Sequence, residues 1–204
     1  LNVPKLSVPR TGVIELQRGL LANFSQDYSY LKTRGISEEV QRNAGICYDS
    51  RSKAVVFPWF DAQKRLRNIK YRATYGKVFW YTKGATPVRE LVYGIDTVTG
   101  TEAVLEEAEI DALSWRTCGV QAIAVGGANF TDQQADIIKR SSINLIYLSG
   151  DNDKAGQKFA DQVAMKLRGF VELRRVIKPS QFKDANEALM AGENLRDYQS
   201  RPIS

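Results

Sequence analysis

The sequence predicts an α/β protein in which a parallel sheet flanked by helices, residues 100–192, follows a smaller α+β unit, residues 28–99. From about residue 101, short apolar strands alternate with helical segments, a pattern typical of a parallel sheet with right-handed crossovers. Before that point, segments rich in β-branched and aromatic residues are separated by short polar breaks, which indicates antiparallel strands. Hydrophobic residues make up 43% of the 204 residues. This content is sufficient for a packed core.

The first 27 residues are expected to form an arm followed by a helix. Residues 1–10 contain two prolines and show no clear period. Apolar residues at helical spacing predict a helix over 12–24, and residues 25–31 begin another short one. Ser37 is placed to cap a helix that ends near Gly45, because a serine oxygen can accept from the first free backbone amides.

The remaining elements follow from the same reasoning. Antiparallel strands are expected at 54–61, 65–74 and 77–82, with Pro58 at an edge or a bulge because proline lacks an amide donor. In the second half of the chain, the spacing of apolar residues predicts strands that alternate with helices, and Thr131 is the expected cap of one helix. The expected strands are 102–106, 122–125, 144–148 and 171–177, and the expected helices are 110–118, 131–140, 154–168 and 184–190. Residues 193–204 are expected to be a tail or linker.

The charge is unevenly distributed along the chain. The first 100 residues carry 16 Lys and Arg against 8 Asp and Glu, whereas the remaining residues carry 13 against 15. The basic first half of the chain suits the binding of a polyanion, and the slightly acidic second half suits the binding of a cation. The chain starts at Leu1 rather than Met, which is consistent with a piece of a longer protein.

Composition excludes several kinds of chemistry. The sequence contains no histidine, which removes a Ser-His-Asp triad, a Cys-His pair and a histidine-rich zinc site. Cys47 and Cys118 are expected to be reduced thiols, and no zinc is expected within this segment. No run of 18 apolar residues and no signal-peptide pattern occurs, so membrane association is not expected.

Acidic residues follow two of the predicted parallel strands. Glu107 leaves the first strand, and Asp151 and Asp153 leave the third. The carboxyl ends of parallel strands meet at one edge of a sheet, where binding residues gather. Hard oxygen donors at such spacing suit Mg²⁺, with Mn²⁺ as the alternative. We therefore predict a metal site of Glu107, Asp151 and Asp153, in which Glu107 binds metal or accepts a proton from an attacking hydroxyl.

The acidic runs resemble the two motifs of the TOPRIM domain, a Rossmann-like fold. Glu107-Ala108-Glu109-Ile110-Asp111 resembles the Glu-Gly-x-x-Asp motif, with Ala108 in the place of glycine. The run 151–156, Asp-Asn-Asp-Lys-Ala-Gly, resembles the Asp-x-Asp-x-Ala-Gly motif. TOPRIM domains occur in DnaG-type primases, topoisomerases, recombination mediators and some nucleases. The resemblance implies that Asp111 supports the site through hydrogen bonds.

Three further runs resemble primases in particular. Residues 183–187, Lys-Asp-Ala-Asn-Glu, resemble an element that follows TOPRIM in phage and Twinkle-like primase–helicases, and Lys183 is then a candidate phosphate contact. Residues 30–37 and 91–95 resemble stretches of the primase subdomain ahead of TOPRIM. The resemblance implies a single-stranded DNA template, ribonucleoside triphosphates and a replicative helicase, fused or separate. It implies a cytoplasmic location, or a mitochondrial one for a Twinkle-like protein.

A basic and aromatic segment precedes the acidic half. Residues 64–83 contain seven basic side chains and no acid, interleaved with aromatic ones. Basic side chains contact the phosphates of a nucleic-acid backbone, and aromatic rings stack on its unpaired bases. On a strand, Lys70 and Arg72 share one face and Tyr71 takes the other. The nucleic-acid and nucleotide contacts that we predict are Arg72 and Lys77 first, then Lys83, Arg67 and Lys70, with Arg89 weaker.

Together these observations predict a primase catalytic core that makes short RNA primers. Two alternatives remain open. One is another TOPRIM enzyme, a nuclease or a topoisomerase fragment, although no nucleophilic tyrosine is identified. The other is a module that binds DNA or a replication partner without catalysis.

Overall fold

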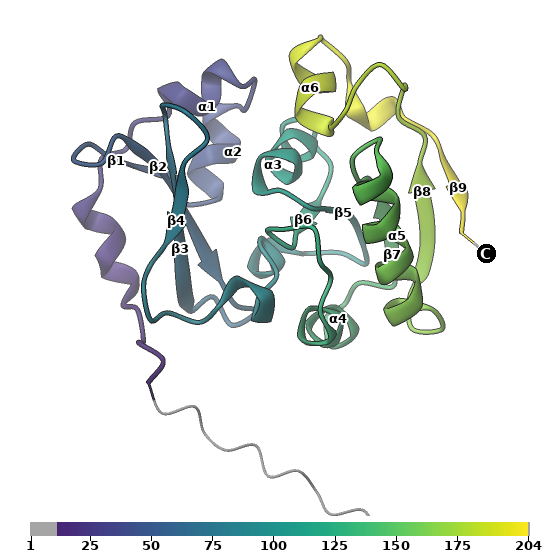
Figure 1. Cartoon of the computed structure of the whole chain (residues 1–204), viewed down its shortest axis with the longest axis horizontal. Helices are drawn as coiled ribbons and strands as arrows, with labels where there is room; N and C mark the ends of the chain where they lie inside the picture. The colour runs from purple at the N-terminus through teal and green to yellow at the C-terminus, as the bar shows by residue number, and fades with distance from the viewer. Residues whose placement is uncertain (1–11, 204) are drawn as a thin grey trace, which may run out of the picture.

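The computed structural model describes residues 12–203 and contains two sheets that lie side by side (Figure 1). A four-stranded sheet has the order β1-β2-β3-β4, and a five-stranded sheet has the order β6-β5-β7-β8-β9. The first sheet is antiparallel and comes from the first half of the chain. The second is parallel apart from β9 and carries helices on both faces, which confirms the predicted fold class.

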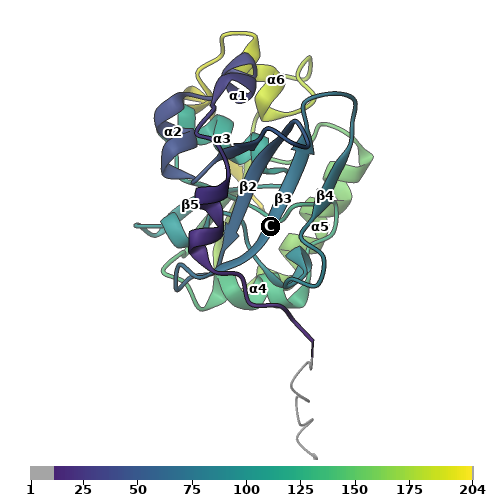
Figure 2. The ribbon, with the colours of Figure 1, turned by 90° about the vertical axis from the view of Figure 1, so that its left-hand side faces the viewer.

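The segment that was expected to form a helix over 12–24 instead lies along the first sheet. Only Arg18–Asn23 is helical, as the 3-10 turn η1. Ile14 donates its amide to the carbonyl of Gly84 at 2.9 Å, which holds the start of the segment in an extended form. The segment runs across the outer face of the sheet (Figure 2). Its Leu16, Leu20 and Leu21 pack against the buried residues of that face. Their spacing therefore reflects contact with a sheet, and the helix prediction was wrong for residues 12–17. The proline-containing arm lies outside the described residues.

Two short helices follow, α1 (Ser29–Thr33) and α2 (Glu38–Asn43). Ser37 caps α2 by accepting from the amide of Val40, as predicted, and the first turn holds two acidic residues. Gly45, just after the helix, has φ +72°, a left-handed conformation that ends it.

The first sheet contains the three predicted strands and one that was not predicted. These are β1 (Cys47–Asp49), β2 (Ala54–Phe60), β3 (Leu66–Ala73) and β4 (Phe79–Tyr81). The short β1 pairs only with Ala54–Val56, so one side of β2 is unpaired at Pro58, and the register shifts one residue later, between Trp59 and Phe60. Pro58 therefore lies at a strand edge beside a bulge, as expected for a residue without an amide donor.

The second sheet forms the predicted parallel unit. Its strands are β5 (Glu102–Glu106), β6 (Ala122–Ala124), β7 (Leu145–Leu148) and β8 (Glu172–Val176). Residues 193–204, expected to be a tail or linker, instead contribute η4 (Leu195–Asp197) and the edge strand β9 (Ser200–Pro202). Because Leu195 is fully buried and β9 pairs with β8, this segment is part of the packed structure.

Helices cover both faces of this sheet. They are α3 (Glu109–Thr117), α4 (Asp132–Lys139), α5 (Lys154–Leu167) and α6 (Ala185–Met190), each within about one residue of its predicted bounds. Thr131 caps α4 in a capping box with Gln134, as predicted. Helices α4 and α5 pack on one face, whereas α3 and α6 lie on the face toward the first sheet (Figure 1).

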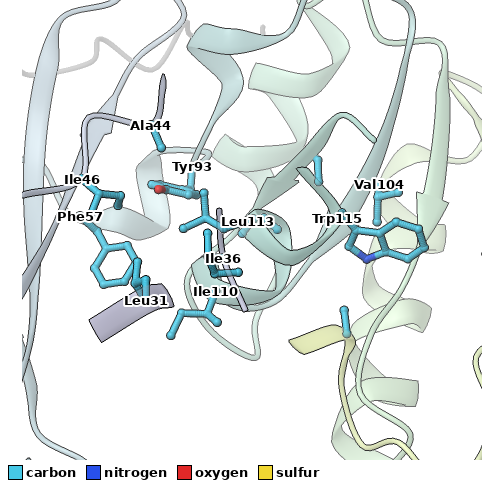
Figure 3. Packing of buried hydrophobic residues seen from close by; sticks show 14 of the residues in the cluster. Leu31, Ile36, Ala44, Ile46, Phe57, Tyr93, Val104, Ile110, Leu113 and Trp115 are labelled. Carbon is cyan, nitrogen blue, oxygen red and sulfur yellow. The ribbon is translucent and has the colours of Figure 1, made fainter. Parts of the chain in front are cut away.

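The two sheets share one hydrophobic core. Leu31, Ile36 and Phe57 from the first unit contact Ile110 and Leu113 from the second (Figure 3). Each of these five side chains is at most 5% exposed. Burying an aliphatic or aromatic side chain stabilises a fold by roughly 1.5–3 kcal/mol, so this contact holds the two units in one relative position.

The 3-10 turns η2 (Val88–Glu90) and η3 (Ile95–Thr97) connect the two units. Tyr93, between them, pairs with Ala124 of β6 and its ring lies 5.3 Å from that of Trp59. Both cysteines are free, as expected. Among the described residues no helix is long and apolar enough to cross a membrane.

Candidate metal and nucleic-acid site

Acidic side chains meet at the carboxyl edge of the parallel sheet. Asp111 lies in the first turn of α3 after β5, Asp151 lies three residues after the end of β7, and Asp184 follows β8 and caps α6. One carboxylate oxygen from each of these three residues lies within 4.8 Å of the others. Three hard oxygen donors at this separation could hold one divalent cation.

Burial and neighbouring negative charge raise the pKa of two members of this cluster. Burial, followed by the nearby Asp184, raises the pKa of Asp111 to about 7. The same two causes raise the pKa of Asp151. The amide of Asn186 donates to Asp111 Oδ1 at 2.9 Å. A bound cation would offset this repulsion, so the donor set fits a hard metal ion.

Asp184 was not among the predicted site residues. The Lys-Asp-Ala-Asn-Glu run indicates its lysine as a phosphate contact and gives no separate role to its aspartate. Asp184 Oδ1 accepts from the amide of Glu187 at 2.8 Å, so it also reads as an ordinary helix cap. Only the packing of α6 against α3 brings it beside Asp111.

Glu107 lies near Asp151 and Asp153. Burial, then the charges of Asp151 and Asp153, raise the pKa of Glu107 to about 7. Its Oε1 is buried and has no hydrogen-bond partner among residues 12–203, so it is available to a ligand that the protein does not itself supply. Ala108 has φ −106°, which any residue adopts, and is exposed, so its methyl group fits where the motif has glycine.

Asp153 has a structural task as well as a predicted metal-binding one. Its Oδ1 accepts from the amide of Gly156 at 2.7 Å and caps α5. A Cβ at Gly156 would lie 2.0 Å from the carbonyl oxygen of Asp151. Gly156 therefore allows the helix to start against the Asp151 backbone.

The middle residue of the Asp-Asn-Asp run holds the neighbouring loop in place. The Asn152 amide donates to the carbonyl of Lys183 at 2.9 Å. Its side-chain Nδ2 donates to the carbonyls of Phe182, at 2.9 Å, and Pro179, at 3.3 Å. These bonds fix the loop 177–184 beside the acidic edge. Lys183 itself is exposed on this loop.

A further acid, Glu106, is buried near Asp111 and was not predicted. It is 1% exposed, and Trp115 Nε1 donates to its Oε1 at 2.7 Å. Burial and the charge of Asp111 raise its pKa well above the usual range. Local sequence does not indicate this buried acid, because Glu106 ends a strand, Glu102–Glu106, whose exposed first residue is also a glutamate.

The first sheet turns a basic and aromatic face toward α3. The strand pairing aligns Lys70 with Tyr81 and Arg72 with Phe79, while Tyr71 stacks on Trp80 at 5.5 Å between ring centroids. Lys70 Nζ lies 4.6 Å from the Phe79 ring centroid, on the same face. Tyr71 packs instead with the outer cluster, as predicted from strand alternation.

Two of the predicted cations are bound to carboxylates of the chain. Lys70 Nζ lies 3.0 Å from Glu109 Oε2, and their side chains are 14% and 2% exposed. Arg67 Nη1 lies 3.1 Å from Asp61 Oδ2. Their charge is thus offset within the protein, which weakens the prediction that they contact a polyanion. Lys77, Lys83 and Arg89 are exposed and Arg72 is half-buried.

Comparison with known proteins is consistent with this geometry. Residues 104–189 match the Toprim-like family. A DNA primase of Deinococcus radiodurans is 30% identical over 80% of this chain, which spans 32% of that protein. The chain therefore spans about a third of the length of this relative.

Solved structures show the same fold. The primase fragment of the bacteriophage T7 primase-helicase protein is 27% identical, with a TM-score of 0.72, over 92% of this chain and 79% of that one. A DnaG primase catalytic domain bound to single-stranded DNA is 17% identical, with a TM-score of 0.71, over 90% of this chain and 77% of that one.

Proposed function

This chain carries a Toprim-like domain within the fold of a primase catalytic core, and we propose that it is the part of a DNA primase that joins ribonucleotides on single-stranded DNA. The observation that carries the proposal is the cluster of Asp111, Asp151 and Asp184, with Glu107 beside it, at the sheet edge that follows the basic and aromatic unit. In this proposal residues 28–99 bind template and nucleotide, and residues 100–192 hold the metal.

The carboxylates would hold Mg²⁺, or Mn²⁺ in its place. Asp111, Asp151 and Asp184 are the ligands that the geometry favours, and Glu107 and Asp153 complete the acidic site around Asp151. A bound divalent ion supplies positive charge to the phosphates during the reaction. Oxygen donors and the absence of histidine and thiolate ligands from the cluster suit a hard cation rather than zinc.

The reaction is the transfer of a nucleotidyl group. The 3′ oxygen of one nucleotide attacks the α-phosphorus of the next, the bond from that phosphorus to the bridging oxygen breaks, and pyrophosphate leaves. Glu107 is the base that accepts the hydroxyl proton, because its raised pKa of about 7 suits proton transfer near neutral pH. Catalysis otherwise consists of positioning and electrostatic stabilisation.

Template and nucleotide would bind along the β3–β4 face. Phe79 is 56% exposed and offers a ring for base stacking. Arg72 and Lys77 are the preferred phosphate contacts, with Lys83 and Lys183 next. The DnaG relative bound to single-stranded DNA supports this class of template. The T7 relative is part of a primase-helicase protein, which supports a helicase partner, fused or separate.

The test is primer synthesis on single-stranded DNA with labelled ribonucleotides and Mg²⁺. Glu107→Gln should lower the rate by at least about 100-fold, the usual contribution of a general base, without unfolding the protein. Asp111→Asn should abolish synthesis, and a circular dichroism spectrum checks the fold. Lys158→Met, at an exposed position of α5, is the matched control. Degradation of the DNA without synthesis would favour a nuclease, and binding without either reaction would favour a non-catalytic module.

A further inference from the structure

Lys178 lies beside the acidic cluster and belongs to none of the motifs. It follows β8 on the loop 177–184, and its Nζ donates to the carbonyl of Gly150 at 3.0 Å. Gly150 immediately precedes Asp151. This hydrogen bond therefore anchors a positive charge next to the loop that carries the Asp-Asn-Asp run.

The loop around Lys178 is held on two sides. Asn152 binds the carbonyls of Pro179, Phe182 and Lys183, as described above. Lys178 is half-buried, whereas Lys183 on the same loop is exposed. A lysine side chain that is anchored at Nζ and partly desolvated keeps its charge near one position, unlike a free surface lysine.

The charge of Lys178 reaches most of the acidic site. It lowers the pKa of Glu107, Asp111 and Asp151 against the larger effect of burial, and it does the same for the buried Glu106. Lys183 acts in this way on Glu107 and Asp151. Lys178, held at the carbonyl next to Asp151, therefore acts on more of these carboxylates than Lys183 does.

We propose that Lys178 contacts the phosphates of the bound nucleotide and of the pyrophosphate product, as a fixed cation beside the divalent metal. This inference rests on the proposed function. The ammonium group has three N–H donors and uses one for Gly150, so two remain for phosphate oxygens at the same edge. Lys178 contacts substrate in this assignment and is distinct from Lys183, which the sequence motif had indicated.

The proposal predicts opposite effects on metal and on phosphate. A fixed positive charge repels a divalent cation and attracts a phosphate. Removing the charge should therefore tighten metal binding by roughly threefold to tenfold, the size expected for charges several ångströms apart in a hydrated site. The same change should weaken phosphate binding. A residue with only a structural role would weaken both when it is replaced.

The experiment uses the full chain and two probes, Mn²⁺ alone and then inorganic pyrophosphate at saturating Mn²⁺, both measured by calorimetry. Lys178→Gln removes the charge and retains a donor for Gly150, Lys178→Met removes both, and Lys178→Arg keeps the charge. Lys158→Met, exposed on α5, is the control for loss of a lysine. Thermal unfolding of each variant shows whether the fold is intact.

We expect Lys178→Gln to bind Mn²⁺ more tightly and pyrophosphate at least about fivefold more weakly, with Lys178→Arg and Lys158→Met close to wild type. Weaker Mn²⁺ binding, or unchanged pyrophosphate binding, in a folded Lys178→Gln variant would overturn the proposal. A third outcome is that the wild-type protein and the Lys178 variants bind both probes as expected while the wild type makes no primer. That result would refute the primase function and still support the phosphate contact. Wild-type protein that does not bind Mn²⁺ would overturn both.

Discussion

Arg34 and Asn186, which are 152 residues apart in the chain, bind each other through two hydrogen bonds. Arg34 Nε donates to Asn186 Oδ1 at 3.1 Å, and Asn186 Nδ2 donates to the Arg34 carbonyl at 2.8 Å. The same Nδ2 donates to Ser114 Oγ at 3.0 Å, and the Asn186 amide donates to Asp111. The Arg-Gly-Ile-Ser run of the first unit is thereby joined to the residues that position two carboxylates of the metal site.

Arg34→Ala should weaken Mn²⁺ binding by roughly tenfold, as expected when a group that orients a metal ligand is removed. The variant removes the guanidinium group that donates to Asn186 Oδ1. Helix α6, which Asp184 caps, is then held less firmly. Calorimetric titration with Mn²⁺ measures the change. Arg51→Ala, in the exposed turn before β2, is the control. Equal metal affinity in the two variants would contradict the prediction.

The metal-free protein should lose stability as the pH rises from about 4 to 7. The pKa of Asp111 and of Glu107 is raised to about 7 in the folded protein, whereas the unfolded chain titrates near 4. In this window the folded state binds more protons than the unfolded state, so stability falls with increasing pH. Urea unfolding with and without Mg²⁺ measures this. Mg²⁺ should stabilise most at pH 7 and above, and a Mg²⁺ effect that is largest near pH 5 would contradict the assignment.

Gly156→Ala should damage the site although the substitution adds one methyl group. The new Cβ would meet the Asp151 carbonyl oxygen at 2.0 Å, so the backbone must shift. We expect a loss of about 1–3 kcal/mol in the free energy of unfolding, and weaker Mn²⁺ binding because Asp151 moves. Gly100→Ala is the control, since a Cβ there has no atom within 4 Å among the described residues. A folded Gly156→Ala variant with wild-type Mn²⁺ affinity would count against this account.

Lys70→Met should destabilise the protein by about 3 kcal/mol, because Glu109, only 2% exposed, would lose its charged partner. The double variant Lys70→Met/Glu109→Met should recover most of this loss, since it leaves no buried charge unpaired. Urea denaturation of the two single variants and the double variant measures the coupling. If the losses in the free energy of unfolding of the two single variants simply add in the double variant, the Lys70–Glu109 pair does not join the two units.

Replacing Arg72 and Lys77 by alanine together should lower the affinity for single-stranded DNA and flatten its salt dependence, by about 1.4 in the logarithmic slope for two phosphate contacts. Fluorescence anisotropy at several salt concentrations gives the slope. Lys158→Met is the control. Lys70→Met should change the slope less than the double variant does, because Lys70 is already paired with Glu109. An unchanged slope in the double variant would reject these two contacts.

Local sequence was sufficient where the structure depends on near neighbours. The strand and helix order after residue 101 follows from apolar spacing, and Ser37 and Thr131 cap their helices through bonds within three residues. The helix expected over 12–24 was wrong for residues 12–17, where a contact with Gly84, far along the chain, holds the backbone extended. The strand β9 was missed for the same reason, since its pairing with β8 gives no local apolar pattern.

The sequence by itself determined the fold class, the two units and the Asp-Asn-Asp run at 151–153, because these depend on periodicity and on residue types at fixed spacing. Only the tertiary structure decided which carboxylates meet. Asp184 joins Asp111 and Asp151 because α6 packs on α3, and Lys70 is committed to Glu109 because the first sheet packs against the same helix. Distances between side chains on different elements depend on packing, and no spacing along one chain encodes them.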